Sequence, residues 1–407
     1  MIWAQQLDAA GITHLPVSPD PPSVDLGDQP HRFILWSDER PVGYIDWPCP
    51  SHIFLKLWKD AWEASSTPSA SQGNAIAAPQ TVSLVICTRD RPADLARCLA
   101  SIPQQTRPPD QVIVVDNRSI SSEVEAVCRT AGVQYIYEGR PGLDIARNTG
   151  AALATGDIVA YTDDDVVLHP HWLERILAAF DHPRILAVTG LVLPAELATP
   201  AQWHFERHWS FGRGFHRIDF DEKFFSRDMF HVAEVWKIGA GASMAFRKSV
   251  FQDIGRFDER LDVGAAGCSG DSEFWHQVLS AGGVCRYEPS AVAFHYHRRE
   301  WEGLRKQIRA YMRGHAAALL VQYERTHHAG NLRQLLFNLP AMYCKRIALR
   351  LFNGKKDTDR FTRDEIVGVA SGVAFYLRSP KPSSSGPLYT NSGEILQQTV
   401  SSTRPSK

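Results

Sequence analysis

Three consecutive aspartates, Asp163–Asp165, carry the clearest chemical signal in the chain. They follow the largely apolar segment Asp157–Tyr161, which predicts a buried strand. Three like charges at a strand end repel one another, so the arrangement favours a divalent cation that takes carboxylate oxygens as ligands. The alternative is an acidic loop in solvent that leads into the following helix, because acidic residues are common in turns.

Two further acidic positions suggest chemistry. Asp116 ends the apolar segment Val112–Asp116 and is followed by Asn117. This pattern predicts either a turn or a carboxylate that binds the base or ribose of a nucleotide. Asp271 and Glu273 begin a predicted helix, whose dipole stabilises negative charge at that end. Asp271 is therefore either the residue that caps the helix or a general base.

His295 and His297 belong to the alternating segment Ala291–His297, and alternation puts both on one face of a strand. A strand histidine is usually structural, but a pair in a chain with an acidic cluster is also consistent with a ligand to a metal or a diphosphate. Arg89 and Arg147 leave a similar choice between neutralising a phosphate and forming structural ion pairs.

The elements that position these residues alternate between strand and helix from Val82 onward. Continuous apolar strands separated by amphipathic helices predict a parallel sheet covered on both faces. Ligands bind such sheets at the carboxyl ends of the strands. We expect the polar residues at these ends to meet along one edge: Thr88, Arg89 and Asp90, then Asp116, then Asp163–Asp165.

Changes of composition divide the chain into parts. A Ser/Ala/Pro-rich segment predicts a linker, and Ser, Thr and Pro dominate the end of the chain. The parts that we expect are a small accessory domain (1–63), a linker (64–80), a catalytic domain (81–300, with a nucleotide-binding half 81–168 and an acceptor half 169–300), a helical region (301–378) and a disordered tail (379–407).

Charge and cysteine content narrow the cellular setting. The net charge of −1 gives no indication of a nucleic-acid partner, and seven cysteines without a CxxC pair favour reduced thiols in the cytoplasm. No apolar run approaches the roughly 18 residues of a membrane span. The segment Arg298–Lys356 nevertheless holds thirteen basic and three acidic residues. Its apolar, basic stretch Leu335–Phe352 predicts either a helical cap or peripheral attachment to anionic lipid, on the inner face of the plasma membrane.

Several segments occur in an order that resembles the family 2 glycosyltransferases, over about Thr81 to Met312. They are TRDR, VVDNRS, RPGLDIARNTGAALATGD, YTDDDVVLHPHWL, GAGASMAFRKSVFQDIGRFDERL, GDSEFW and EPSAVAFHYHRR. The resemblance implies an α/β fold of the GT-A type, with a Rossmann-like, mostly parallel sheet and helices on both faces. To this we add the small N-terminal α+β unit and the helical C-terminal region.

The resemblance also implies roles for particular residues. The nucleotide and its phosphates would contact Thr88, Arg89, Asp116, Arg147, Asp163 and Asp164. A Mn²⁺ or Mg²⁺ ion would be held by Asp163 and Asp165, with His295 as a further ligand. Asp271 would be the catalytic base. Because the usual Glu-Asp pair before the base is Gly270-Asp271 here, Glu273 stays a second candidate for that role.

These residue types suit transfer of one sugar from a nucleotide-sugar, most commonly a UDP-sugar, to a hydroxyl of a glycan or lipid-linked acceptor. A metal offsets the charge of the diphosphate leaving group, and one base without a nucleophile implies inversion. We expect a role in the synthesis of cell-surface or exported glycans or glycolipids. A nucleotidyltransferase is the nearer alternative, but the loop after the first strand lacks glycine. An inactive nucleotide- or sugar-binding module is the other, and the retained carboxylates argue against it.

Overall fold

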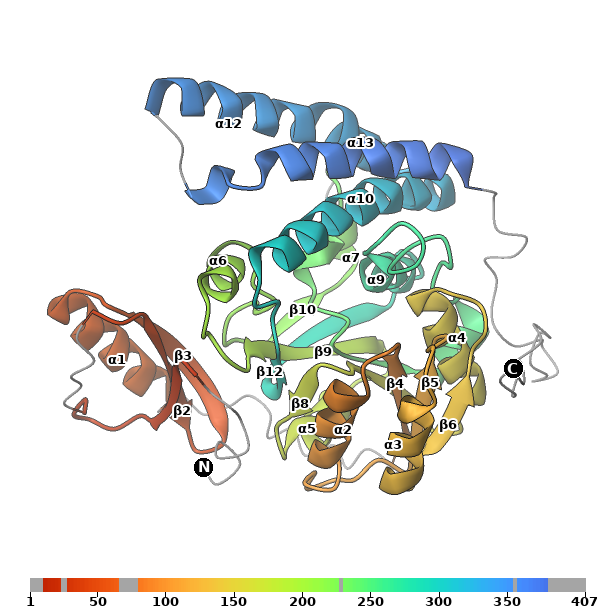
Figure 1. Ribbon diagram of the computed structural model, residues 1–407, viewed down its shortest axis with the longest axis horizontal. Helices are drawn as coiled ribbons and strands as arrows, with labels where there is room; N and C mark the ends of the chain where they lie inside the picture. The colour runs from red at the N-terminus through yellow and green to blue at the C-terminus, as the bar shows by residue number, and fades with distance from the viewer. Residues whose placement is uncertain (1–9, 23–27, 66–79, 227–229, 354–356, 380–407) are drawn as a thin grey trace.

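A small sheet and one helix form the N-terminal part of the chain (Figure 1). The computed structural model describes residues 10–22, 28–65, 80–226, 230–353 and 357–379, so most of the predicted linker and tail lies outside the described residues. The sheet consists of β1 (Ile12–Pro16), β2 (His31–Ser37) and β3 (Arg40–Trp47), and β2 and β3 form an antiparallel hairpin. Helix α1 (Ser51–Ser65) packs its buried residues, among them Trp58, against this sheet.

The second sheet has the strand order β10-β12-β9-β11-β7-β4-β5-β6, with β8 beside β12. Its first half is parallel and contains β4 (Val82–Thr88), β5 (Gln111–Asp116), β6 (Gln134–Tyr137) and β7 (Ile158–Asp163). The connecting helices are α2 (Pro92–Ser101), α3 (Glu123–Ala131) and α4 (Leu143–Leu153). Thr88 lies opposite Asp116, and Cys87 lies opposite Asp163, so the polar strand ends do meet along one edge.

The second half of this sheet contains antiparallel pairs, which makes the sheet mixed. Its strands are β8 (Val166–Leu168), β9 (Ile185–Pro194), β10 (Ile218–Phe220), β11 (Ser243–Arg247) and β12 (Val284–His295). Its helices are α5 (Trp172–Ala178), α6 (Pro200–Trp209), α7 (Glu222–Phe225), the short η2 (Val235–Lys237), α8 (Lys248–Asp253) and α9 (Gly270–Ser280). Two buried apolar clusters cover the two faces of the sheet. The predicted α/β fold class is confirmed.

A helical region covers the open side of the second half, as expected (Figure 1). It contains α10 (Trp301–Thr326), α11 (Ala329–Arg333), the π-helix η3 (Gln334–Asn338), α12 (Leu339–Asn353), η4 (Asp357–Asp359) and α13 (Thr362–Arg378). Helix α13 packs along α10, and α12 lies outermost in Figure 1. Among the described residues, no helix combines the length and the apolar character needed to cross a membrane.

The N-terminal unit touches the second sheet and its helices through polar and aromatic side chains. Arg32 pairs with Asp46 in its own unit and with Glu206 on α6. The Trp36 ring stacks on His169, with ring centroids 5.4 Å apart. These contacts place the unit beside α6 and away from the helical region.

Candidate active site

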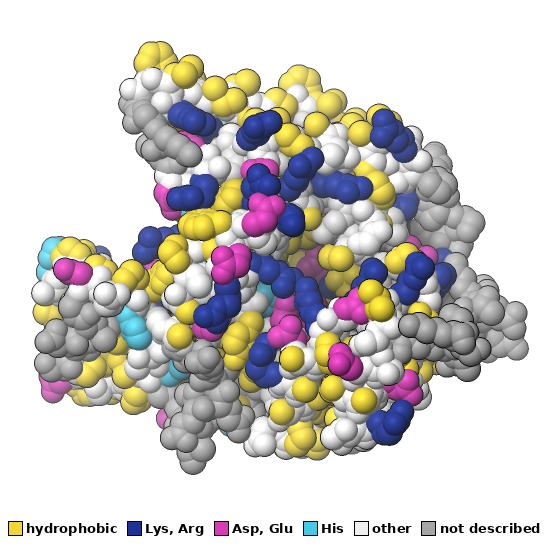
Figure 2. Space-filling view, in the orientation of Figure 1, with side chains coloured by type: hydrophobic (Ala, Val, Ile, Leu, Met, Phe, Trp, Pro, Cys, Tyr) yellow, Lys and Arg dark blue, Asp and Glu magenta, His cyan; other side chains and the backbone are white. Residues whose placement is uncertain are grey.

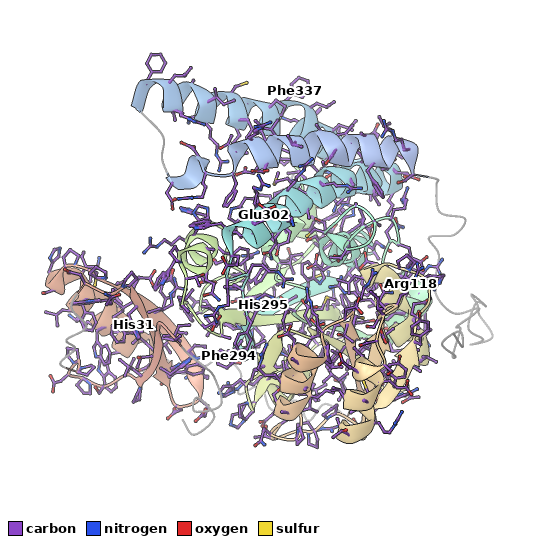
Figure 3. All side chains as sticks on the ribbon, in the orientation of Figure 1. His31, Arg118, Phe294, His295, Glu302 and Phe337 are labelled. Atoms are coloured by element: carbon purple, nitrogen blue, oxygen red, sulfur yellow. The ribbon has the colours of Figure 1, made fainter. Side chains whose placement is uncertain are left out.

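A cavity of about 880 Å³ opens at the carboxyl ends of β4 and β7 and continues beneath α10. Figure 2 shows acidic and basic side chains gathered around the hollow in the centre of this face. His295, labelled in Figure 3, lies between the sheet and the helix that carries Glu302. The lining joins the polar strand ends to aromatic and apolar residues of the second half, including Trp209, Trp236 and Tyr311.

Two of the three consecutive aspartates converge with a histidine at the floor of the cavity. Asp163 ends β7, Asp165 follows it, and β12 pairs with β8 so that His295 lies opposite Val166. One ligand atom from each of Asp163, Asp165 and His295 lies within 4.8 Å of the others. Two carboxylates and an imidazole at this spacing could hold a divalent cation. The structure therefore brings together the three residues that the sequence predicts as metal ligands.

The middle aspartate points elsewhere and has protein partners. Asp164 accepts hydrogen bonds from the Thr88 hydroxyl at 2.7 Å and from Arg91 at 3.0 Å. Arg91 also reaches Asp165, at 3.1 Å. The charge of the acidic cluster is thus partly compensated by an arginine that sequence reasoning passed over. Arg91 lies in the segment TRDR, but nothing in the local sequence distinguishes it from Arg89.

Burial and mutual repulsion shift the protonation of this cluster. Burial, reinforced by Asp165, raises the pKa of Asp163 to about 6 and that of Asp164 to about 7. Burial alone would also raise the pKa of Asp165, but the paired His295 and Arg91 lower it below the ordinary range. For His295, burial opposes the charged form, and Asp165 at 3.2 Å still raises its pKa. A cation that takes His295 as a ligand must therefore displace a proton.

Arg147 connects the acidic cluster to the opposite wall of the cavity. Its buried guanidinium pairs with Asp144 at 3.0 Å and with Asp262 at 2.6 Å, and it lies 4.0 Å from Asp163. Arg147 thus forms structural ion pairs and also lines the cavity, and its contact with a phosphate stays a prediction. Asp262 was missed, because nothing in its local sequence indicates a partner more than a hundred residues away.

Asp271 lines the cavity near Arg147. Its carboxylate accepts hydrogen bonds from the backbone N–H groups of Gly241, at 2.8 Å, and Ser272, at 2.6 Å. The N-cap of α9 is Ser269, so Asp271 belongs to the first turn and does not cap the helix. Burial raises the pKa of Asp271, while Arg147 acts in the opposite direction. A side chain at Gly241 would lie 2.7 Å from Arg147 and 3.2 Å from Asp271, so only glycine leaves room for both.

Glu273 faces the protein core on the other side of α9. It is fully buried and pairs with Arg325 at 2.7 Å and Gln277 at 2.6 Å. Among the described residues, Glu273 is not part of the cavity lining. Of the two candidate bases, only Asp271 is placed to meet a ligand in the cavity.

The unusual glycine before Asp271 has a physical explanation. A side chain at Gly270 would collide with the buried carboxylate of Asp144. Asp144 lies within the first turn of α4, whose N-cap is Gly142. Its carboxyl group fills the space that a side chain at position 270 would need, and burial raises the pKa of this carboxyl group well above the ordinary value.

The remaining predicted nucleotide ligands lie at different depths. Asp116 is fully buried and accepts hydrogen bonds from Ser119 N–H and the Tyr135 hydroxyl, both at 2.8 Å, while its neighbour Asn117 lines the cavity. Arg89 lines the outer part of the cavity and faces Asp90 at 3.6 Å. Thr88 lies deeper and is held by Asp164.

Comparisons with known proteins agree with this fold. A mannosyltransferase from Pyrobaculum calidifontis, solved with GDP-mannose and Mn²⁺, superposes with a TM-score of 0.50 over 74% of this chain and 87% of that chain, at 16% identity. A glucosyl-dolichyl phosphate glucuronosyltransferase from Haloferax volcanii is 30% identical over 187 residues, which cover 44% of this chain and 56% of the relative. A pre-mycofactocin glycosyltransferase from Mycobacterium tuberculosis is 29% identical over 251 residues, which cover 60% and 48%.

The fold and these relatives define a class of transferase, the glycosyltransferases with a GT-A fold. Residues 83–255 match the model of glycosyl transferase family 2. The chain spans about half the length of the two sequence relatives named above. The predicted family and fold are therefore confirmed.

Proposed function

We propose that the protein transfers one sugar from a nucleotide-sugar donor to an acceptor hydroxyl, with inversion and with the help of a divalent cation. The observation that carries the proposal is the shared cavity of Asp271 and the cluster of Asp163, Asp165 and His295, with Arg147 between them. One side of this cavity suits a diphosphate with its cation, and the other side offers a buried carboxylate as a base.

The cluster of two carboxylates and an imidazole fits Mn²⁺ or Mg²⁺, and the imidazole favours Mn²⁺ because Mg²⁺ prefers oxygen ligands. Such an ion would neutralise the charge that develops on the diphosphate leaving group. The chain adds basic residues at the same place, since Arg91, Arg298 and Lys306 also line the cavity. Thr88 and Asp164 lie where the nucleoside would be oriented, and we propose UDP as the first nucleotide to test.

Asp271 would accept the proton of the acceptor hydroxyl as the new glycosidic bond forms. Its raised pKa makes it a stronger base than an exposed aspartate, and two backbone N–H groups hold it in one orientation. We assign Asp271 the role of base and assign no second carboxylate the role of nucleophile. We therefore propose a single displacement without a covalent intermediate, and a single displacement inverts the configuration at the sugar carbon. Trp209 and Trp236 line the cavity and could stack on a sugar, whereas Trp203 and Trp275 are buried in the core.

The acceptor is proposed to be a lipid-linked or membrane-proximal glycan. The cavity extends to Gln334 and Leu339, where η3 meets α12. The outer face next to this opening exposes large apolar side chains, and Phe337 in Figure 3 points away from the other helices. Such a face would rest on the cytoplasmic surface of a membrane and bring a lipid-anchored hydroxyl to the cavity. We propose that this places the enzyme in the synthesis of a cell-surface or exported glycan.

The decisive experiment is a donor screen. Thermal shift of the purified chain is measured with a panel of UDP-, GDP- and dTDP-sugars, with Mn²⁺, with Mg²⁺ and with EDTA. We expect one nucleotide class to stabilise the protein only when a divalent ion is present, and donor hydrolysis to follow the same preference. Metal-independent stabilisation, or none by any nucleotide-sugar, would contradict the proposal.

A further inference from the structure

A second group of metal-binding residues lies on the outer side of α6, away from the cavity. His204 and His208 are one helical turn apart on α6 and face the same side. Asp357 of η4 meets them from the helical region. One ligand atom from each of the three residues lies within 4.8 Å of the others. None of the three belongs to the predicted active site or lines its cavity.

The distances within this group match those of a tetrahedral metal site. Asp357 Oδ2 lies 3.0 Å from His204 Nδ1 and 3.3 Å from His208 Nε2. Zn²⁺ bonds of about 2.0–2.1 Å place neighbouring ligand atoms of a tetrahedron roughly 3.3 Å apart. A shift of a few tenths of an ångström would therefore let one ion replace both hydrogen bonds. Two histidines and one carboxylate are also a common Zn²⁺ ligand set, with water at the fourth position.

The surroundings hold the ligands in place and leave an approach from solvent. The His204 ring is buried against Trp301 and Phe361, with ring centroids 5.6 and 5.2 Å away. His208 and Asp357 are partly exposed, at 25% and 53% of their side-chain surface. The nearby cation Arg360 lies 3.6 Å from Oδ1 of Asp357, so it faces the oxygen that the two histidines do not use.

We propose that His204, His208 and Asp357 form a Zn²⁺ site that fastens the helical region to α6. Nearby on α6, Glu206 pairs with Arg32 and with His297, and His297 lies 2.9 Å from His295. A Zn²⁺ ion on the outer side of α6 would therefore hold this helix in place. The inner side of α6 supports His295, a predicted metal ligand, through Glu206 and His297. The site supplies no chemistry to sugar transfer, and the proposal does not depend on the proposed function.

The test uses the full chain with Asp165→Ala, which disables the cavity cluster and leaves the α6 site alone. After treatment with a chelator, Zn²⁺ is titrated in competition with a coloured chelator, and Co²⁺ is titrated as a spectroscopic probe of tetrahedral coordination. We expect one equivalent of Zn²⁺ to bind and to raise the melting temperature by at least about 3 °C. Adding His208→Ala should lower the Zn²⁺ affinity by at least about 10–100-fold and abolish the shift.

The control is His171→Ala, which removes a partly exposed histidine that also pairs with an acidic neighbour, Glu174. Among the described residues, His171 belongs to no group of three possible metal ligands. His171→Ala should leave the Zn²⁺ affinity unchanged. Asp357→Asn provides a second, exposed change if His208→Ala reduces folding, and it should also weaken Zn²⁺ binding. Absence of a Zn²⁺ equivalent, or equal affinity with and without His208, would overturn the proposal and leave a cluster held by hydrogen bonds alone.

Discussion

Helix α9 separates two buried networks of arginines and carboxylates that differ in their balance of charge. On the core side, Asp258 pairs with Arg260 and Arg325, and Arg325 also pairs with Glu273. On the cavity side, the single guanidinium of Arg147 faces Asp144, Asp262 and Asp163, with Asp271 close by. With Glu324, which pairs with Arg260 at 2.9 Å, the core side has three carboxylates for two arginines, whereas four carboxylates surround Arg147 alone.

This difference separates a structural network from a functional one. Buried ion pairs persist when each charge has a partner, because an unpaired buried charge is costly. An excess of carboxylates around one buried arginine is stable only with raised pKa values or with a bound cation, and both are typical of active sites. Burial raises the pKa of Glu273 as well, to about 7, so the pKa alone does not separate the two residues. We propose Asp271 for the chemistry and Glu273 for the structure because only Asp271 lines the cavity.

The largest expected effect follows from replacing Asp271. Asp271→Asn should reduce sugar transfer by about 10²–10⁴-fold, because the acceptor hydroxyl loses its general base. Binding of the nucleotide-sugar should change little, since the diphosphate contacts the opposite part of the cavity. Turnover is measured with saturating donor, and donor affinity is measured by calorimetry in Mn²⁺.

Glu273→Gln is the matched variant and should show the reverse pattern. Removal of one partner from a buried ion pair typically lowers the free energy of unfolding by roughly 3–5 kcal/mol. We expect a value near the lower end here, because Arg325 still pairs with Asp258 in the variant. Urea denaturation measures this change, and the turnover of the folded fraction should stay near that of the wild type. A stable Glu273→Gln protein that has lost turnover would break the comparison and make Glu273 the base.

The cluster of Asp163, Asp165 and His295 also predicts a metal effect. Asp165→Ala removes a ligand of the proposed cation and should weaken metal-dependent binding of the nucleoside diphosphate by at least about 10–100-fold, the loss typical of disturbing a metal site. EDTA should weaken binding by the wild-type protein to a similar extent. Equal calorimetric affinities in Mn²⁺ and in EDTA would mean that Arg91 and His295 alone balance the aspartates.

The strand ends of this site were predictable, whereas the charge balance was not. Apolar runs such as Val82–Cys87 fix the strands, and parallel register then brings Thr88, Asp116 and Asp163 to one edge without further information. The partners of Arg147 depend on how distant loops pack, and Asp262 reaches it across 115 positions of sequence. Asp271 and Glu273 likewise differ in the face of α9 on which they lie. The helical region that carries Arg325 packs on the face of Glu273, and the local sequence does not reveal this contact.

Protonation offers a smaller and graded test. The carboxylate form of Asp271 is the proposed base, and its pKa is raised by burial, so transfer should fall as the pH drops through that raised pKa. Below it, kcat should decrease about tenfold per pH unit, starting at a higher pH than for an ordinary aspartate. The pH profile of kcat at saturating donor and Mn²⁺ checks this. A kcat independent of pH down to pH of about 4 would indicate that Asp271 is not the base.

The smallest expected effect concerns the surface of α12, where two basic side chains lack an acidic partner among the described residues. Arg346 pairs with Glu365 at 2.8 Å, whereas Lys345 and Arg350 are exposed and have no acidic partner among the described residues. They lie on the helix that exposes Ile347 and Phe352, so they could face anionic lipid.

Each basic residue near an anionic membrane contributes on the order of 1 kcal/mol, so Lys345→Glu with Arg350→Glu should weaken binding to phosphatidylserine vesicles by at least about tenfold. Binding is measured by co-sedimentation at low and high salt, because screening should weaken the wild type in the same direction. Arg129→Glu on α3, where Arg129 already pairs with Glu125, is the control for a general change of charge and should leave binding unaltered. If the wild type does not sediment with anionic vesicles at low salt, the exposed face of α12 does not bind lipid. The acceptor then need not be membrane-bound, and the distinction between paired and unpaired charge would hold for the buried networks only.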